Sequence, residues 1–312
     1  MKKLPTGLVI LIIIPVLWIT SCHPIDKEKY YEEGVSKLLA TYRNATIKDV
    51  TYNLSFSIPE GKEALVTGEA VIDFSLTSKR EPVVIDFRVS QEYINSLLVN
   101  GKTIDPSFIN GHIVVAKKHL TKRFNRIELS FRAGDLSLNR SEDFLYTLFV
   151  PDRASTAFPC FDQPDIKARF SLTLNVPTGY RAMSNSPAVS NDTTDSKITV
   201  QFSETKPIST YLFAFAAGKF DLVEKEIDGV TMEMLHRETR PDYIENNADE
   251  IFKLHYNSLK WLEDYTQIPY PFEKFGFVLI PSFQYSGMEH PGSIYYQASS
   301  LGRGTRLERP PG

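Results

Sequence analysis

Glu289 lies among residues whose types suggest a binding or catalytic role. It stands in the run Ser-Gly-Met-Glu-His, which follows an apolar run at 275–281. We expect the Glu289 run to form a loop or an exposed strand edge. An edge strand offers unpaired N–H and C=O groups to an extended peptide, and a carboxylate at its end can bind the peptide's α-amino group, whose pKa is about 8. The alternative is an ordinary surface glutamate beside a turn.

A second stretch, at 158–170, contains residues that could also carry a function. It reads Phe-Pro-Cys-Phe-Asp-Gln-Pro and continues, after two residues, with Lys-Ala-Arg-Phe. Its residue types indicate a structural corner, in which Asp162 accepts hydrogen bonds from backbone N–H groups and Cys160 packs in the core. We therefore assign neither residue to catalysis.

The two stretches resemble two signatures of the M1 family of zinc aminopeptidases and occur in that family's order. Residues 286–290 resemble the family's G-x-M-E-N loop, and residues 158–170 are similar to its F-P-C-F-D-E-P-x-x-K-A-x-F signature. Residues 262–281 also resemble the helix, Pro-Tyr-Pro turn and strand that lead into the family's loop. The resemblance covers residues 46–301.

The resemblance implies a fold and a set of substrate-binding residues. The fold is mainly β: an antiparallel β-sandwich or saddle as N-terminal domain, followed by the truncated start of a thermolysin-like α/β catalytic domain. In the family the loop glutamate binds the α-amino group of the substrate, which implies that role for Glu289. The main chain of Gly287 and Met288 would align the peptide, and His290 would complete the substrate-binding loop.

Some positions depart from the family's pattern. Ser286 replaces the first glycine of the loop and His290 replaces its asparagine, which leaves the details of the subsites open. The family usually has Gln or Glu ten residues before Cys160 as a second anchor for the amino group, whereas this chain has Val150. The amino group then has one partner fewer, or another residue takes that role.

The zinc motif of the family does not occur in these 312 residues. The reaction needs zinc held by H-E-x-x-H and a more distant glutamate, with the motif's own glutamate activating the metal-bound water. The run from His236 to Arg240 begins in a similar way but ends in arginine, and we interpret it as a coincidence. In relatives the zinc helix follows the loop glutamate at a distance that places it past Gly312. We predict that zinc belongs to the intact family member and that this chain, as it stands, binds none.

Two hypotheses about function come from these observations. The first is the N-terminal portion of an exported M1-like metallo-aminopeptidase that removes N-terminal amino acids from peptides, interrupted before its metal site and inactive alone. The alternative is a non-catalytic envelope lipoprotein that binds peptides or partners. A carbohydrate-binding sandwich is a third reading, but it does not explain the Gly-Met-Glu run at 287–289.

The elements that would position these residues can be read from the periodicity of apolar side chains. Four runs alternate apolar and polar residues and predict strands with one buried face: 71–76, 126–131, 170–174 and 197–202. Asn100-Gly101 and Asn110-Gly111 are typical of hairpin turns, because Asn and Gly tolerate positive φ. We therefore predict a β domain over residues 46–235.

The periodicity changes after that domain. Apolar residues at three- and four-residue steps predict a helix over 243–265, which Pro269 and Pro271 follow. A buried strand comes next, so residues 236–301 read as an incomplete catalytic domain. Residues 302–312, with three arginines, three glycines and two prolines, read as an unrelated tail or a flexible end.

The N-terminus has the pattern of an export signal. Residues 1–21 combine Lys2 and Lys3 with an apolar run and small residues before Cys22, and that run is shorter than the ~20 residues of a membrane-spanning helix. The Ile-Thr-Ser-Cys run resembles the lipobox of bacterial lipoproteins, which implies a lipidated Cys22 and a tether over 22–45, in which residues 25–39 read as a tether or a short helix. An ordinary secretory signal is the alternative. We expect a cell-envelope protein, lipid-anchored on the periplasmic or outer-membrane side.

Composition limits the partners. The net charge of −3, from 35 basic and 38 acidic residues, comes without a cluster of Lys and Arg, so we predict no nucleic-acid partner. The expected partners are peptide substrates and, through the lipid, a membrane. Cys22 and Cys160 are the only cysteines of the sequence, and they form no disulfide framework if Cys22 is acylated.

Overall fold

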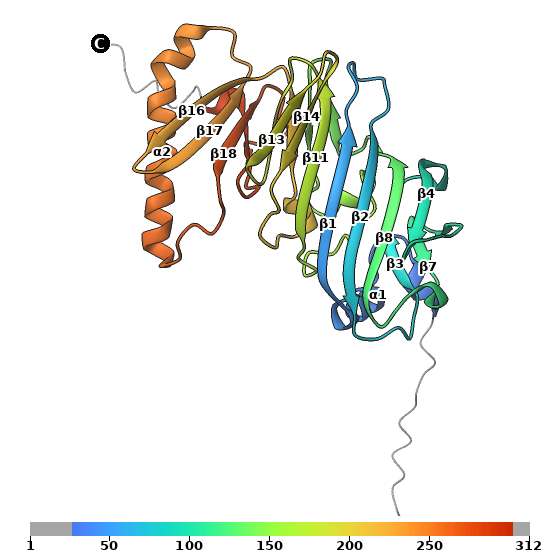
Figure 1. The fold of residues 1–312 in the computed structure, drawn as a ribbon. Helices are drawn as coiled ribbons and strands as arrows, with labels where there is room; N and C mark the ends of the chain where they lie inside the picture. Colours follow the sequence, from blue (N-terminus) through green and yellow to red (C-terminus); the bar gives the residue numbers. More distant parts are fainter. Residues whose placement is uncertain (1–26, 302–312) are drawn as a thin grey trace, which may run out of the picture.

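The structure, a computed structural model, describes residues 27–301 and consists mainly of strands (Figure 1). Its largest sheet has eight strands in the order β13-β14-β11-β1-β2-β8-β4-β5. Neighbouring strands are antiparallel except β1 and β11, which run parallel. The strands are β1 (Ile47–Ser57), β2 (Thr67–Leu76), β4 (Ile94–Val99), β5 (Lys102–Thr103), β8 (Arg123–Arg132), β11 (Arg169–Pro177), β13 (Ala188–Thr193) and β14 (Lys197–Phe202).

Two smaller sheets cover the apolar face of this large sheet. One has the order β12-β15-β10-β9 and the other the order β3-β7-β6. Buried side chains from all three sheets form one core, in which the rings of Phe158 and Phe213 pack edge to face at 5.8 Å. The strands are β3 (Val83–Asp86), β6 (Ser107–Ile109), β7 (His112–Val115), β9 (Leu138–Arg140), β10 (Phe144–Thr147), β12 (Arg181–Ser184) and β15 (Phe215–Gly218).

A five-stranded sheet of order β16-β17-β18-β20-β19 begins a second unit. Its central strands β17, β18 and β20 are parallel, and a long helix connects β17 to β18. The elements are β16 (Asp221–Ile227), β17 (Val230–His236), α2 (Pro241–Thr266), β18 (Phe275–Ile280), β19 (Gly287–Met288), β20 (Ile294–Gln297) and α3 (Ala298–Leu301).

The five-stranded sheet extends across the predicted domain boundary at residue 235. β17 pairs with β18, with Met232 opposite Phe275, and β16 pairs with β17 along its whole length. Both strands therefore belong to the second unit, which starts at about residue 221. The sequence did not reveal this because a strand has the same alternating pattern whichever sheet it joins.

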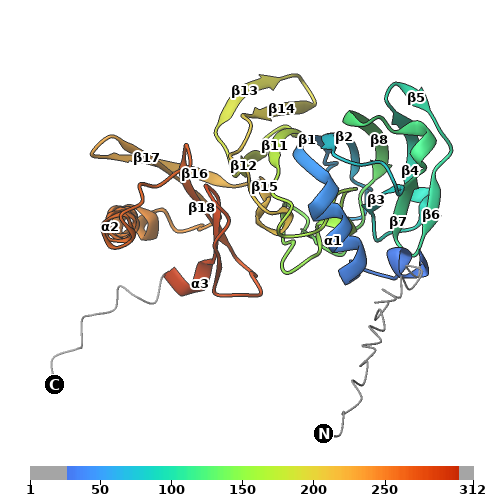
Figure 2. The same cartoon turned by 90° about the horizontal axis from the view of Figure 1, so that it is seen from below.

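The sheets and α2 form successive layers (Figures 1 and 2). All residues of β10 and β15 are buried, because their side chains face the large sheet and the five-stranded sheet alternately. Tyr146 of β10 contacts the second unit, for example, while Leu145 contacts the first core. α2 covers the opposite face of the five-stranded sheet through Phe252 and Leu259. The four-stranded sheet thus joins the two units.

Local predictions from the sequence are confirmed. All four alternating runs lie in strands, and 197–202 is the whole of β14. Asn100 and Asn110 have φ of 52° and 47° in their hairpin turns, as expected for Asn-Gly. The helix predicted at 243–265 is α2, which ends at Thr266 and is capped by Gln267 in the left-handed conformation.

The segment predicted as a tether, 22–45, is folded where the structure describes it. It contains the 3₁₀ turn η1 (Lys27–Tyr31), and α1 (Lys37–Thr46) occupies its C-terminal part. Leu39 and Arg43 of α1 are both 1% exposed, so this helix packs on the β domain instead of extending from it. The remaining 3₁₀ turns are η2 (Gln91–Tyr93), η3 (Lys117–His119), η4 (Ala154–Thr156) and η5 (Thr210–Leu212).

The predicted signal peptide, Cys22 and the 302–312 tail lie outside the described residues. Among residues 27–301, none of the helices combines the length and the apolar character needed to span a bilayer.

Candidate functional site

The loop that carries Glu289 lies at the edge of the five-stranded sheet. The buried strand β18 leads into it, and β19 then pairs with β20 on one side only, with Gly287 opposite Tyr296. A Cβ on Gly287 would lie 3.3 Å from the Tyr296 ring, so glycine lets the two strands approach closely here. The outer side of β19 keeps backbone groups that an added strand can pair with.

Glu289 directly follows this edge strand and its side chain is exposed. Among the described residues, nothing forms a hydrogen bond or an ion pair with its carboxylate. The side chains on either side of Glu289 turn inward, since Met288 is 7% exposed and His290 is fully buried. The loop therefore presents one free carboxylate beside one free strand edge, which is an arrangement suited to a cationic group at the end of an extended chain.

Met288 packs the loop against the N-terminal domain. It belongs to a buried cluster with Tyr146 of β10, Phe283 and Tyr295 of β20. Val150 packs against the same cluster, although it lies far from the loop in the sequence. The position at which the family has its second amino anchor thus packs on the apolar cluster that contains Met288, and in this chain it is apolar.

The expected role of His290 in substrate binding is not supported for its side chain. The imidazole is 0% exposed, and its ring lies 4.6 Å from that of Tyr295. Burial lowers the pKa of His290 to about 3, so the ring is neutral at physiological pH. Within residues 27–301 neither ring nitrogen has a hydrogen-bond partner. His290 therefore packs behind the loop, and only its main chain lies near the edge.

The corner at 158–170 has the structural role that its residue types predict. The Asp162 carboxylate accepts hydrogen bonds from the backbone N–H of Ser155 at 2.9 Å and from the Thr210 hydroxyl at 2.8 Å. Cys160 is 0% exposed, and burial raises the pKa of its thiol. Cys160 and Asp86 exchange two backbone hydrogen bonds, at 2.8 and 3.0 Å. The predictions of a backbone cap and a packed thiol are confirmed.

A buried charge network beside this corner was missed by the sequence reasoning. Both oxygens of Asp86 accept hydrogen bonds from the Arg43 guanidinium, at 2.6 and 2.8 Å, and one also accepts from the backbone N–H of Asp162. His112 Nδ1 lies 2.8 Å from Asp86, and its Nε2 lies 2.9 Å from the carbonyl oxygen of Glu32. A lone arginine on a short amphipathic helix was the signal available, but its partner is 43 residues away.

The residues from His236 to Arg240 form hydrogen bonds with one another. His236 ends β17 and accepts a hydrogen bond at Nδ1 from the Glu238 backbone N–H. Hydrogen bonds from Arg240 lower the pKa of Glu238 to about 2. Across the part of the chain that the structure describes, no three His, Cys, Asp or Glu side chains group to hold a metal. The described residues therefore do not fit a zinc ion.

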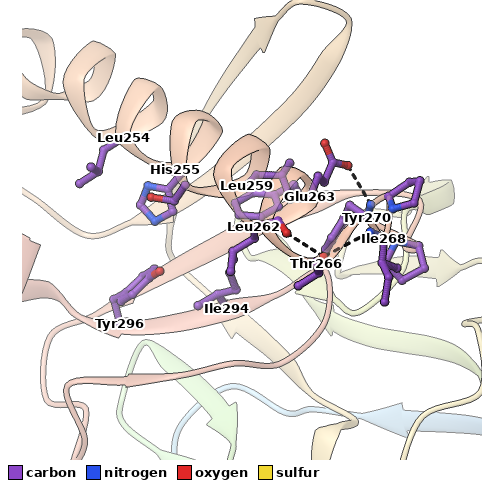
Figure 3. A pocket seen from close by; sticks show the side chains of 14 residues that line it. Leu254, His255, Leu259, Leu262, Glu263, Thr266, Ile268, Tyr270, Ile294 and Tyr296 are labelled. Atoms are coloured by element: carbon purple, nitrogen blue, oxygen red, sulfur yellow. Dashed lines mark hydrogen bonds between the residues drawn. The ribbon is translucent and has the colours of Figure 1, made fainter.

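An apolar cavity of about 630 Å³ lies on the α2 side of the five-stranded sheet (Figure 3). Leu254, Leu259 and Leu262 of α2 face Ile294 and Tyr296 of β20 across it. No residue predicted for the substrate site lines this cavity.

Two segments of the chain match known protein families. Residues 135–212 match the peptidase M1 N-terminal domain. Residues 251–305 match the peptidase family M1 domain. The first segment includes the corner at 158–170, and the second includes α2 and the Glu289 loop. The resemblance predicted from the sequence is confirmed in both parts.

Several curated aminopeptidases are similar to half of this chain. A leucyl aminopeptidase of Saccharolobus solfataricus is 33% identical over 155 residues, which are 50% of this chain and 19% of that protein. Aminopeptidase M1 of Arabidopsis thaliana is 34% identical over 158 residues, 50% and 17%. Endoplasmic reticulum aminopeptidase 1 of Mus musculus is 38% identical over 157 residues, 50% and 16%. The chain thus spans less than a fifth of the length of these relatives.

Proposed function

From the premise that this chain carries an M1 peptidase N-terminal domain and the first part of an M1 peptidase domain, we propose that it is the N-terminal portion of an exported metallo-aminopeptidase. The intact enzyme removes N-terminal amino acids from peptides and uses zinc. The observation that carries this proposal is the free carboxylate of Glu289 at the end of the open edge strand β19.

The edge explains how a peptide would be oriented. An extended peptide adds to the outer side of β19 through main-chain hydrogen bonds, and its α-amino group reaches Glu289. An acetylated or internal peptide segment has no cation at that point, so the carboxylate selects for a free N-terminus. Because Val150 is apolar, Glu289 binds the amino group without a second side-chain acceptor from that position.

The 312 residues include the proposed peptide-binding edge but not the zinc-binding motif. They contain no H-E-x-x-H motif, and the described part has no metal-binding group. We therefore propose that this chain alone binds peptides and does not hydrolyse them. The family chemistry, in which zinc polarises the carbonyl and activates water, would come from residues that this sequence does not include.

We also propose that the protein is exported and held at a membrane by a lipid on Cys22. The support is the basic, apolar and small-residue order of residues 1–22 alone. A non-catalytic envelope lipoprotein that binds peptides remains the second candidate function, because the Glu289 edge can bind an N-terminus without cleaving it.

Peptide titration of the purified chain tests the main proposal. We expect a tripeptide with a free N-terminus to bind at least tenfold more tightly than its acetylated form, since a charge-assisted hydrogen bond contributes about 1.5–3 kcal/mol. Glu289→Gln should remove this preference, and Glu250→Gln, at an exposed glutamate on α2, should not. Equal binding of both peptides would refute the role of Glu289. Chelator-sensitive release of amino acids from aminoacyl-anilides would refute the proposed inactivity.

A further inference from the structure

A second cavity lies between the edge of the eight-stranded sheet and the five-stranded sheet, away from Glu289. Its volume is about 530 Å³, and its walls come from β12, β13 and β14 on one side and from β16, β17 and Lys274, just before β18, on the other. β16 and β17 lie beside β13 and β14 in Figure 1. Cavities of this size hold ligands as large as small metabolites.

The wall formed by the five-stranded sheet is acidic. Glu224 of β16 lies directly opposite Glu233 of β17, so two carboxylates share one face of the sheet. Like charges in this position repel each other. Lys274 Nζ lies 2.8 Å from Glu233 and compensates one of the two charges. Two carboxylates and one ammonium group leave one negative charge on this wall.

Lys274 is a buried residue of this wall. It is 9% exposed, and its ammonium group lies over Gly276, where a Cβ would be 3.0 Å from Nζ. Of its three N–H donors, only the one to Glu233 has a partner within residues 27–301. A buried ammonium with unused donors lining a cavity is a polar group that a ligand can satisfy.

The opposite wall carries the complementary charge. Arg181 of β12 lines the cavity and is exposed, and Asn191 of β13 lies on the same side. Among the described residues, neither the Arg181 side chain nor that of Glu224 has a hydrogen bond or ion pair. The guanidinium offers a planar pair of donors that matches a carboxylate.

Apolar side chains lie between the charged groups. Met183, Leu235 and Phe202 line the cavity and are largely buried, with Leu222 beside them. The cavity therefore combines a free cation on one wall, a net negative charge on the other wall and an apolar surface between them. Few small molecules match all three, because most carry one kind of charge.

We propose that this cleft binds an α-amino acid with an apolar side chain, in its zwitterionic form. The carboxylate of the ligand pairs with Arg181, its ammonium group faces Glu224, the carboxylate that Lys274 does not compensate, and its side chain packs against Met183 and Leu235. The same class of molecule is the product of the reaction proposed above, but the inference stands on the cleft alone. A ligand there would contact both units and so favour one arrangement of them.

Calorimetric titration of the purified chain with L-leucine tests this site. Leucine should bind at least tenfold more tightly than L-leucinamide, which lacks the carboxylate, and than N-acetyl-L-leucine, which lacks the ammonium group. Each tenfold corresponds to about 1.4 kcal/mol, less than one charge-assisted hydrogen bond contributes. Absence of leucine binding, or equal binding of the three compounds, would overturn the proposal.

Variants locate the binding. Arg181→Gln and Glu224→Gln should each weaken leucine binding at least tenfold, and both positions are exposed, so the fold should be retained. Arg80→Gln and Glu63→Gln, at exposed positions away from the cleft, serve as matched controls and should change nothing. Glu289→Gln tests whether leucine binds at the loop instead, because the loop carboxylate is proposed to bind an α-amino group. If Glu289→Gln abolishes leucine binding and Arg181→Gln does not, leucine occupies the loop site and the cleft proposal is wrong.

Discussion

Replacing Arg43 by methionine is expected to destabilise the protein far more than an ordinary loss of a salt bridge. The guanidinium of Arg43 is 1% exposed and donates hydrogen bonds to both oxygens of Asp86 and, at 2.8 Å, to the carbonyl of Val84. Methionine keeps most of the side-chain volume but leaves the Asp86 carboxylate buried without its main cation. Removing one partner of a buried pair costs about 3–5 kcal/mol.

A matched control separates burial from geometry. Arg126 and Asp73 form the same two-pronged pair, at 2.7 and 2.8 Å, but Arg126 is 49% exposed. Exposed pairs contribute about 0–1 kcal/mol, because water solvates both charges when they separate. Arg126→Met should therefore reduce the free energy of unfolding by less than about 1 kcal/mol.

Urea denaturation followed by circular dichroism at pH 7 measures both variants. The difference between them should be at least about 2 kcal/mol, which is the gap between the buried and exposed cases. Similar losses for Arg43→Met and Arg126→Met would refute the reasoning, because they would mean that burial of the Asp86 network adds nothing to the stability of the fold.

Three further predictions concern the loop, acid stability and the N-terminus. Gly292→Ala should weaken binding of peptides with a free N-terminus in the titration above, because φ is +69° and an added Cβ would lie 2.1 Å from the Asn185 carbonyl oxygen; unchanged binding would contradict this. Burial raises the pKa of Asp86, but Arg43 and His112 outweigh it and lower the pKa overall, so its contribution is present above about pH 4 and should be lost as pH falls through its lower folded value. The free energy of unfolding of Arg43→Met should therefore fall less steeply with decreasing pH than that of the unsubstituted protein. Cys22→Ser should abolish incorporation of labelled fatty acid in a bacterial host, and labelling of the variant would contradict the lipid anchor.

Elements that depend on neighbouring residues could be predicted from the sequence. The three- and four-residue steps at 243–265 identified α2, because helical side chains recur on one face over a few turns. Asn100-Gly101 identified a hairpin turn, since positive φ is a property of two adjacent residues. The role of Asp162 as a backbone cap was also local, as Ser155 is seven residues away.

Features that depend on distant pairing could not be predicted. The unit to which β16 and β17 belong depends on β18, across the whole length of α2. The α1 segment looked like a tether because its charged residues suit solvent, and only the position of Asp86 shows that Arg43 is buried. A charged residue has the same appearance in a sequence whether its partner is water or a buried carboxylate.

The candidate site divides in the same way. The residue types at 286–290 and at 158–170, and their order, were sufficient to identify the family resemblance and to select Glu289, because those signatures are short and contiguous. Only the tertiary structure decided that Glu289 faces solvent at a strand edge while His290 is buried behind it, and that Val150 packs on the cluster containing Met288. Exposure and proximity are set by how the sheets pack on one another, and no local run of residues encodes which surfaces that packing leaves free.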